Sequence, residues 1–455
     1  MPDWFIIWLP RLTIALFVFA VGSCIGSLIN VLVYRLPLGL DVVRPTSRCP
    51  SCQTKLTWRE NIPIFGWLLL RGRCRFCRSK ISPEYPIVEA FTATLFALIY
   101  VLWYMVRPDA VWLGIPFGEA APEWAGNGMS NTWPVFVVIL TLVGCLIAMT
   151  LVDARTYTIP LVLAWIPAIA AVLILPSHAA WFEMKYGTLE SLSEVAWGSE
   201  GRRAWVSAPG WLWTLPTPMP EQGGLQLKLI GASIAGTLGL GVSMLLLRLG
   251  LIRPSFADYA EWEAGEIARL QAEHDASGGE SGEGADQEPD EPTLWIQYPH
   301  ARREMFKEVA FLGAPVGLAW LGAWLAPRVL EPDPALWLTV LSGVLLGYLV
   351  GGAVVWGVRI LGSLAFGKEA MGLGDVHLMA AVGACVGWID PVLAFFLAAF
   401  LGTGWEVARK VFGGAMNKAL PYGPHLAVAT LLVLLLKPLV ELGLSEMLST
   451  PVNLP

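Results

Sequence analysis

Long apolar runs constrain the fold of this chain more than any other feature. Ten apolar runs are candidate spans, several of them close to the ~20 residues that a helix needs to cross a bilayer, although the run at 376–388 is shorter and its helix is expected to extend beyond these limits. They lie at about 5–33, 87–106, 133–152, 160–175, 227–249, 308–328, 336–360, 376–388, 392–410 and 424–443. Hydrophobic residues make up 55% of the chain and charged residues only 15%, which excludes a soluble globular protein of this length. The sequence predicts an all-α polytopic membrane protein with about ten transmembrane helices.

The lysine and arginine residues predict how these helices are oriented. Ten of them lie in the loop 34–86, and an excess of basic residues marks the cytoplasmic side of a membrane protein. The first run, within 1–33, is expected to remain as an uncleaved helix with its N-terminus outside. Counting helices forward from this loop places Asp153 and Asp375 on the cytoplasmic side. A loop at 176–226, which contains five tryptophans, is expected on the outer side.

One acidic segment accounts for the net charge of −6. Residues 257–293 hold twelve acids and one base, so the rest of the chain is mildly basic. A helical piece is predicted at 256–273, followed by a disordered stretch at 276–292 that is too charged to pack. This stretch is either a solvated linker or a docking segment for a basic partner. No basic tract of the kind that binds nucleic acid is present.

Four cysteines form two C-x2-C pairs in the loop 34–86: Cys49, Cys52, Cys74 and Cys77. Two such pairs suit four thiolates around one tetrahedral zinc ion. Neighbouring arginines favour the thiolate form. Disulfides or free thiols are the alternatives, although disulfides do not persist in the cytoplasm. Four thiolates leave no open coordination position, so the expected zinc is structural.

Two acidic residues at the ends of apolar runs suggest catalysis. Asp153 follows the run 135–152, and Asp375 lies in Met371–Asp375, a segment with two glycines. Acids at a membrane boundary are costly and indicate a functional role. Two close carboxyl groups share a proton and can act together in peptide hydrolysis. The structural alternatives are an ion pair between Asp153 and Arg155, and a helix-capping role for Asp375.

The order of these motifs resembles that of the type IV prepilin peptidases, which are leader peptidases and N-methyltransferases. Five stretches carry the resemblance: Gly26–Pro37, Arg48–Glu89, Leu151–Pro160, Glu369–Leu378 and Pro421–Pro424. The fourth is close to the GxGD segment of the family. The resemblance covers about residues 20–175 and 336–435.

The resemblance implies cleavage of prepilin or pseudopilin leaders at the cytoplasmic face of the bacterial inner membrane. It implies methylation of the new N-terminus, with S-adenosylmethionine as the methyl donor. It also implies that the assembly machinery of pili or of type II secretion is a partner of the enzyme. Asp153 and Asp375 would be the catalytic aspartates, supported by Gly372 and Gly374, and the four cysteines would bind zinc. No fingerprint for the methyl donor is present, so the residues that bind it are not predicted.

The chain departs from the family pattern in several places. The family has eight helices, so the ten runs predict an inserted pair. The predicted organisation is a first helix (1–33), a zinc loop (34–86), helices carrying Asp153 (87–175), an outer loop (176–226), an inserted pair (227–328) and helices carrying Asp375 (336–443). His377 and His425 are expected to have solvated or packing roles. The alternatives to a bifunctional enzyme are a peptidase without methylation, and a transporter or assembly scaffold.

The acidic stretch provides a simple test of the linker interpretation. Deleting residues 276–292 should leave leader cleavage within about twofold of wild type, because a solvated linker packs against nothing. Cleavage would be measured on a co-expressed prepilin. Loss of cleavage would instead support the docking interpretation.

Overall fold

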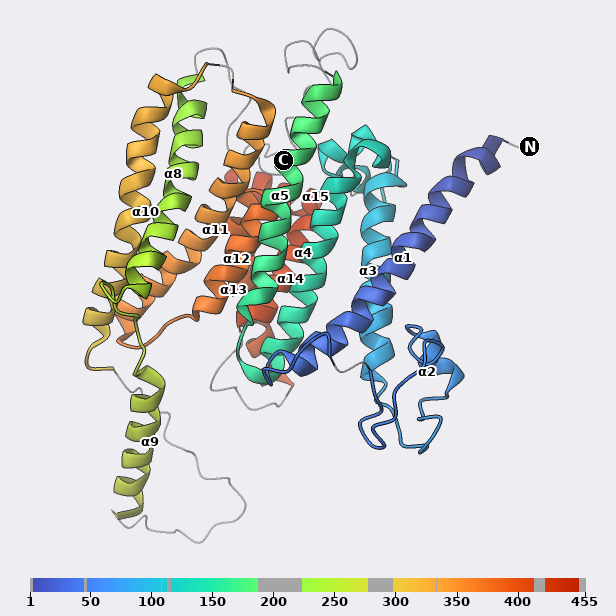
Figure 1. Cartoon of the computed structure of the whole chain (residues 1–455), viewed down its shortest axis with the longest axis horizontal. Coiled ribbons are helices and arrows are strands. Elements are labelled where there is room, and N and C mark those ends of the chain that lie inside the picture. The colour runs from blue at the N-terminus through green and yellow to red at the C-terminus, as the bar shows by residue number, and fades with distance from the viewer. Residues whose placement is uncertain are drawn as a thin grey trace.

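The computed structural model describes residues 3–44, 47–107, 109–112, 114, 116–186, 223–276, 298–332, 334–412 and 422–449. Within these ranges the protein is helical, and its β-structure consists of isolated bridge residues, most of them in the cysteine-rich loop. The helices form an elongated bundle with small elements at both ends (Figure 1). The predicted all-α polytopic fold is confirmed.

Eight helices are long and apolar enough to cross a membrane in the part of the chain that is described. They are α1 (Asp3–Arg35), α3 (Glu84–Tyr104), α4 (Met129–Thr156), α5 (Leu161–Tyr186), α8 (Gly223–Arg248), α10 (Ala301–Val329), α11 (Leu336–Phe366) and α13 (Ile389–Val411). Each coincides with a predicted run. Helix α5 continues well beyond the predicted end at 175, so the first part of the predicted outer loop is helical. Most of that loop lies outside the described residues.

The other two predicted runs differ from simple crossings. Helix α12 (Leu373–Val386) has 14 residues, or about 21 Å, which is shorter than the ~30 Å hydrocarbon core of a bilayer. The last run is divided into α14 (Tyr422–Leu435) and α15 (Lys437–Leu448), which meet at an angle of 92°. The helix of the short run at 376–388 was expected to extend beyond those limits, and α12 begins three residues earlier. The bend in the last run was not predicted, because hydropathy registers apolar length but not a break in the helix.

The shorter elements flank the bundle. They are α2 (Phe65–Leu69), the 3-10 helices η1 (Phe117–Ala120) and η2 (Glu123–Asn127), and α9 (Tyr259–Ala276). Helix α9 corresponds to the predicted helical piece at 256–273. The sequence predicted a disordered stretch at 276–292 after this helix. Its first residue is the last residue of α9, and the rest lies outside the described residues.

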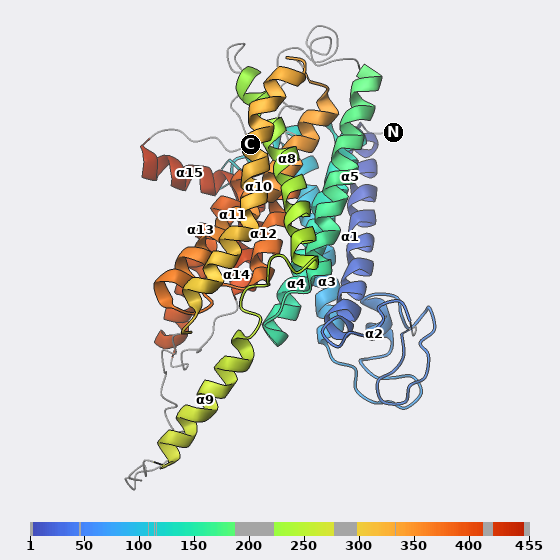
Figure 2. The same cartoon turned by 60° about the vertical axis from the view of Figure 1, so that its left-hand side comes forward.

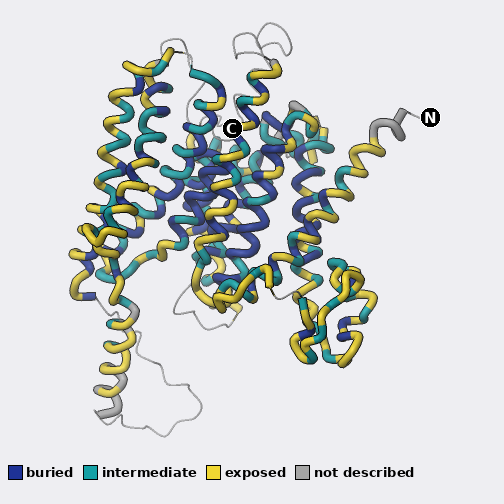
Figure 3. The backbone as a smooth tube through the Cα atoms, viewed as in Figure 1, coloured by how far each residue is buried: buried dark blue, intermediate teal, exposed yellow. Residues whose placement is uncertain are grey.

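Burial divides the bundle into a centre and a periphery. Helix α12 is buried along almost its whole length, and most of α4 is buried as well (Figure 3). Helices α11 and α12 approach closely where Gly347 faces Gly383. Close approach of this kind is typical of membrane helices, where small residues allow backbones to pack. The two acidic residues singled out in the sequence thus lie on the most enclosed helices.

The N-terminal helices form a second close pair. A Cβ atom at Gly22 would lie 2.8 Å from the Cα of Ala93, and one at Gly26 would lie 2.6 Å from the Cα of Glu89. Two glycines four residues apart therefore let α1 pack directly onto α3. The cysteine-rich loop connects these two helices and lies at the same end of the bundle as α9 (Figures 1 and 2).

Candidate active site and metal centre

The four predicted metal-binding cysteines come together in the loop between α1 and α3. Their sulfur atoms all lie within 4.8 Å of one another. The Sγ atoms of Cys49 and Cys77 are 3.8 Å apart, and those of Cys52 and Cys74 are 3.9 Å apart. These distances exclude disulfides, whose sulfurs are about 2.0 Å apart. They match the roughly 3.8 Å between ligands of a tetrahedral zinc ion with Zn–S bonds of about 2.3 Å.

Two copies of one local turn present the cysteines. In the first, the N–H of Cys49 donates to the carbonyl of Thr54, and the N–H of Gln53 donates to the carbonyl of Cys49. The second repeats this pattern twenty-five positions later, from Cys74 to Arg78. Gln53 and Arg78 both adopt positive φ angles, of 56° and 59°. Each turn therefore directs its two thiols to the same side.

Hydrogen bonds lower the thiol pKa at two of the four cysteines, whereas desolvation and hydrogen bonds with Cys49 and Cys77 raise the pKa of Cys74. The backbone N–H of Cys52 donates to the sulfur of Cys49 and is the main reason that the pKa of Cys49 falls to about 6. A hydrogen bond with the hydroxyl of Ser79 is the main cause of the lowered pKa of Cys77. These interactions contribute more than the neighbouring arginines that the sequence suggested. Four thiols at this spacing, two of them biased toward thiolate, fit a structural zinc ion.

The cysteine-rich loop is fastened to the bundle. The N–H of Ile64 donates to Oε2 of Glu89 on α3 at 2.6 Å, and Glu89 is buried. The indole N–H of Trp67 donates to the carbonyl of Ile81 at 3.2 Å. The position of the cysteine cluster is therefore fixed relative to the membrane helices.

Asp153 lies in the last turn of α4. The helix ends because Tyr157 adopts a left-handed conformation, and its N–H bonds to the carbonyl of Asp153. The predicted alternative, an ion pair between Asp153 and Arg155, does not form. Arg155 instead pairs with Glu84 at 3.0 Å, and the side chain of Asp153 is buried. Among the described residues no basic side chain forms an ion pair with Asp153, and a carboxyl group buried in this way is costly, which is typical of a functional group.

Asp375 lies in the first turn of α12. Gly372 is the N-cap residue of this helix, and its backbone N–H donates to the carboxyl group of Asp375. This contact is half of a capping box, so the predicted capping role is present in part. Asp375 is nevertheless buried, and the charge of Asp153 acts on it directly. The structure therefore brings the two carboxyl groups, far apart in sequence, into electrostatic contact.

Three elements meet at the two aspartates. A Cβ atom at Gly423, at the start of α14, would lie 2.6 Å from Oδ2 of Asp153. Ile159, which follows α4, lies against both Gly423 and Gly374. The ends of α4, α12 and α14 thus converge on one small volume, and two of these contacts require a residue without a side chain.

The two glycines before Asp375 differ in their surroundings. A Cβ atom at Gly374 would lie 2.9 Å from Cβ of Ile159, so this glycine allows a close approach. A Cβ atom at Gly372 would meet nothing nearer than 3.8 Å, and its φ of −71° suits any residue. Of the two supporting glycines predicted from the sequence, Gly374 makes the tighter contact.

Sequence reasoning gave no individual role to several residues at this site. Gly423 belongs to Pro421–Pro424, which the sequence identified only by resemblance. Tyr422 donates from its hydroxyl to the carbonyl of Phe395 at 3.0 Å, which fixes the start of α14 beside Asp153. His377 is partly buried on α12, and His425 is partly buried on α14.

The contact between Gly423 and Asp153 leads to a testable expectation. Gly423→Ala should lower the activity of the site by about 10- to 100-fold, because the new methyl group would displace the carboxyl group of Asp153. Gly404→Ala on α13 is the matched control, since a Cβ atom there would meet nothing within 4 Å. Turnover of a prepilin substrate by both variants would be compared. Equal activity of the two would show that the close approach is unimportant.

Two segments of the chain match known families. Residues 20–103 match the family described as Bacterial Peptidase A24 N-terminal domain. Residues 312–407 match the Type IV leader peptidase family. Two separate parts of the chain are therefore similar to type IV leader peptidases. The first match contains the four cysteines and the second contains Asp375, whereas Asp153 lies between the two matches.

Known members of the family are similar to parts of this chain. A protein of Myxococcus xanthus named prepilin leader peptidase/N-methyltransferase is 52% identical over 82 residues, which are 18% of this chain and 24% of that protein. A protein of the same name from Klebsiella pneumoniae is 41% identical over 104 residues, covering 22% and 44%. Another, from Stutzerimonas stutzeri, is 27% identical over 232 residues, covering 46% and 68%. No solved structure matches the chain.

Proposed function

We propose that this protein is a type IV leader peptidase, an aspartic endopeptidase that removes the leader peptides of type IV prepilins or pseudopilins. The observation that carries the proposal is the electrostatic contact between Asp153 and Asp375 in an enclosed site. The names of the relatives supply the substrate class. We assign Asp153 and Asp375 as the catalytic residues, with Gly374, Gly372 and Gly423 supporting their positions.

The two carboxyl groups suit general acid–base catalysis. One ionised aspartate takes a proton from a water molecule as the water attacks the scissile carbonyl carbon. The other aspartate, protonated, donates to the carbonyl oxygen. When the tetrahedral species collapses, the C–N bond breaks and the amine takes the proton that the first aspartate received. One hydroxyl of the tetrahedral species returns its proton to the second aspartate as the carboxyl product forms. The pair then returns to its shared-proton state without a covalent intermediate.

We propose that the active site faces the cytoplasm of the bacterial inner membrane. The basic loop 34–86 lies at the same end of the bundle as α9, and α1 ends and α3 begins there (Figures 1 and 2). The ten lysine and arginine residues of the loop 34–86 support a cytoplasmic location for this end of the bundle. A prepilin whose leader lies in the cytoplasm and whose apolar segment lies in the bilayer would reach the site from this side.

The zinc ion and the methyl donor would serve different roles. Zinc bound by Cys49, Cys52, Cys74 and Cys77 would hold the cytoplasmic loop in its folded shape and take no part in hydrolysis. S-adenosylmethionine would supply the methyl group for the newly formed N-terminal amine, as the relatives' names suggest. We assign no residues to its binding.

Co-expression with a candidate prepilin, followed by mass analysis of the product's N-terminus, tests both activities. Cleavage before the mature apolar helix and a mass increase of one methyl group are expected. A cleaved product with an unmodified amine would support the peptidase without methylation. An uncleaved prepilin in the presence of folded enzyme would contradict the proposed function.

A further inference from the structure

Arg359 is a buried charge on a membrane-spanning helix that the proposed catalytic step does not use. Its side chain is only 1% exposed, and it lies near the end of α11. A buried guanidinium group is stable only when charged or polar partners satisfy its donors. Arg359 therefore requires partners, and their positions indicate what the residue does.

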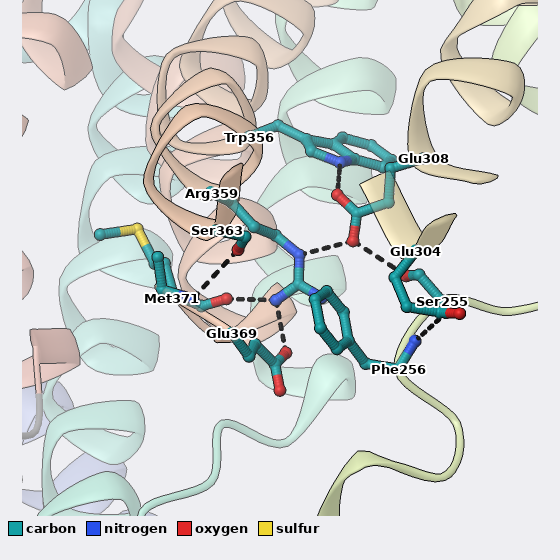
Figure 4. A network of polar contacts seen from close by, with 10 residues as sticks. Ser255, Phe256, Glu304, Glu308, Trp356, Arg359, Ser363, Glu369 and Met371 are labelled. Atoms are coloured by element: carbon teal, nitrogen blue, oxygen red, sulfur yellow. Dashed lines mark hydrogen bonds and ion pairs between the residues drawn. The ribbon is translucent and has the colours of Figure 1, made fainter. Parts of the chain in front are cut away.

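The partners of Arg359 come from two directions (Figure 4). On one side, its Nε atom donates to Oε1 of Glu308 on α10 at 2.8 Å. On the other side, its Nη1 atom donates to Oε1 of Glu369 and to the backbone carbonyl of Met371. The ring of Phe256 lies 5.3 Å from the guanidinium carbon. The planar group thus connects α10 to the segment 367–372 between α11 and α12.

Glu308 is itself held in place. The indole N–H of Trp356 donates to its Oε2 atom at 2.8 Å, and the hydroxyl of Ser255 donates to its Oε1 atom at 2.9 Å. Glu308 is buried, and the charge of Arg359 compensates its own. A carboxylate with three donors is a rigid anchor for the guanidinium group.

The segment 367–372 is fixed at several successive positions. The carbonyl of Gly367 accepts from the N–H of Tyr298 at 2.7 Å, and the N–H of Ala370 donates to the hydroxyl of Ser363 at 3.1 Å. Arg359 donates to the side chain of Glu369 and to the carbonyl of Met371, on either side of Ala370. Met371 directly precedes Gly372, whose N–H contacts Asp375. A short chain of contacts therefore runs from α10 to this aspartate.

We propose that Arg359, oriented by Glu308, is a positioning residue for Asp375. This inference rests on the proposed function, because it takes Asp375 as a catalytic group. It gives α10, which the sequence placed in an inserted helix pair, a role in shaping the active site. The guanidinium fork holds the Met371 carbonyl and so sets where the first turn of α12 begins.

The geometry requires an arginine rather than any cation. Two different nitrogen atoms of one planar group bond to acceptors on opposite sides. A lysine ammonium is a point charge on a flexible stem and cannot reproduce this fork. Arg359→Lys therefore separates positioning from simple charge compensation.

The test compares variants of the full chain in proteoliposomes, with a prepilin as substrate. Arg359→Lys and Glu308→Gln should each lower kcat by about 10- to 100-fold, because small displacements of a catalytic group are costly. KM should change by less than about twofold, since both side chains are buried and paired with each other. The double variant should be no worse than the poorer single variant, because both residues act through one contact.

Glu304→Gln is the matched control. Glu304 is another buried acid on α10, one turn before Glu308, and it accepts from the N–H of Phe256 and pairs with Lys307 without contacting Arg359. Its variant should keep kcat within about threefold of wild type. Wild-type kcat in Arg359→Lys, or a loss in Glu304→Gln equal to that in Glu308→Gln, would overturn the proposal.

A second measurement keeps the inference independent of cleavage. Hydrogen exchange of the backbone amides at 367–376 should accelerate by at least about tenfold in Glu308→Gln and Arg359→Lys, but not in Glu304→Gln. Trp356→Phe, which removes one donor to Glu308 and keeps an aromatic ring, should show a smaller increase. Unchanged exchange in all variants would overturn the inference. A wild-type protein that leaves the prepilin uncut would instead contradict the proposed function, and exchange would still decide the role of Arg359.

Discussion

Replacing either Asp153 or Asp375 with asparagine should reduce leader cleavage by at least about 1,000-fold. An amide can neither take a proton from water nor return one to the leaving amine. Both residues act as one unit, so the double variant should be hardly worse than either single variant. Asparagine is nearly the same size as aspartate, and the helices that carry these residues should remain folded.

Asp390 provides the control for this prediction. It is a third buried aspartate, in the first turn of α13, and it interacts with Lys437 rather than with the other two aspartates. Asp390→Asn should therefore retain cleavage. The measurement is the rate of prepilin processing at equal amounts of folded protein in the membrane. Full activity of Asp153→Asn or Asp375→Asn would remove that residue from the mechanism.

Removing one cysteine from each C-x2-C pair should abolish metal binding and unfold the cysteine-rich loop. A Cys49→Ser/Cys74→Ser variant keeps two thiols, too few to hold a structural zinc ion. Apparent binding free energies for such ions are about 10–16 kcal/mol, far more than the few contacts that fasten this loop to α3. Metal analysis should show about one zinc per chain in wild type and almost none in the variant. Limited proteolysis should then cut within 47–81.

Cys24→Ser is the matched control, because Cys24 is an exposed thiol on α1 outside the cluster. It should keep its zinc and its resistance to protease. A Cys49→Ser/Cys74→Ser variant that retained one zinc per chain would show that the metal binds elsewhere. A wild-type protein without metal would show that the clustered thiols stabilise the loop in another way.

The cysteine cluster was the part of the candidate site that the sequence predicted best. Each C-x2-C pair sits in a tight turn, and a turn is determined by a few neighbouring residues. The pairing of the two turns followed from the need of one ion for four ligands. Local spacing and the chemistry of zinc together left few other arrangements.

The aspartates were found for a different reason. An ionisable group at the end of an apolar run is unusual enough to be noticed in sequence. Their surroundings were not predictable in the same way. The suggested Arg155 partner pairs with Glu84 instead, and Gly423 lies against Asp153 because α14 packs beside α4. Such contacts depend on side-chain packing between helices that are distant in the chain.

The ten apolar runs, the basic loop, the cysteine spacing and the position of each acid were fixed by sequence alone, because hydrophobicity, charge and turn geometry act over a few residues. Only the tertiary structure decided where α12 begins and ends, that the last run bends at Leu436, and that Arg359 joins α10 to the segment before Asp375. The sequence of a single helix does not show which other helix it will pack against. Contacts between helices arise when close-packed surfaces select one arrangement, and that selection involves the whole bundle at once.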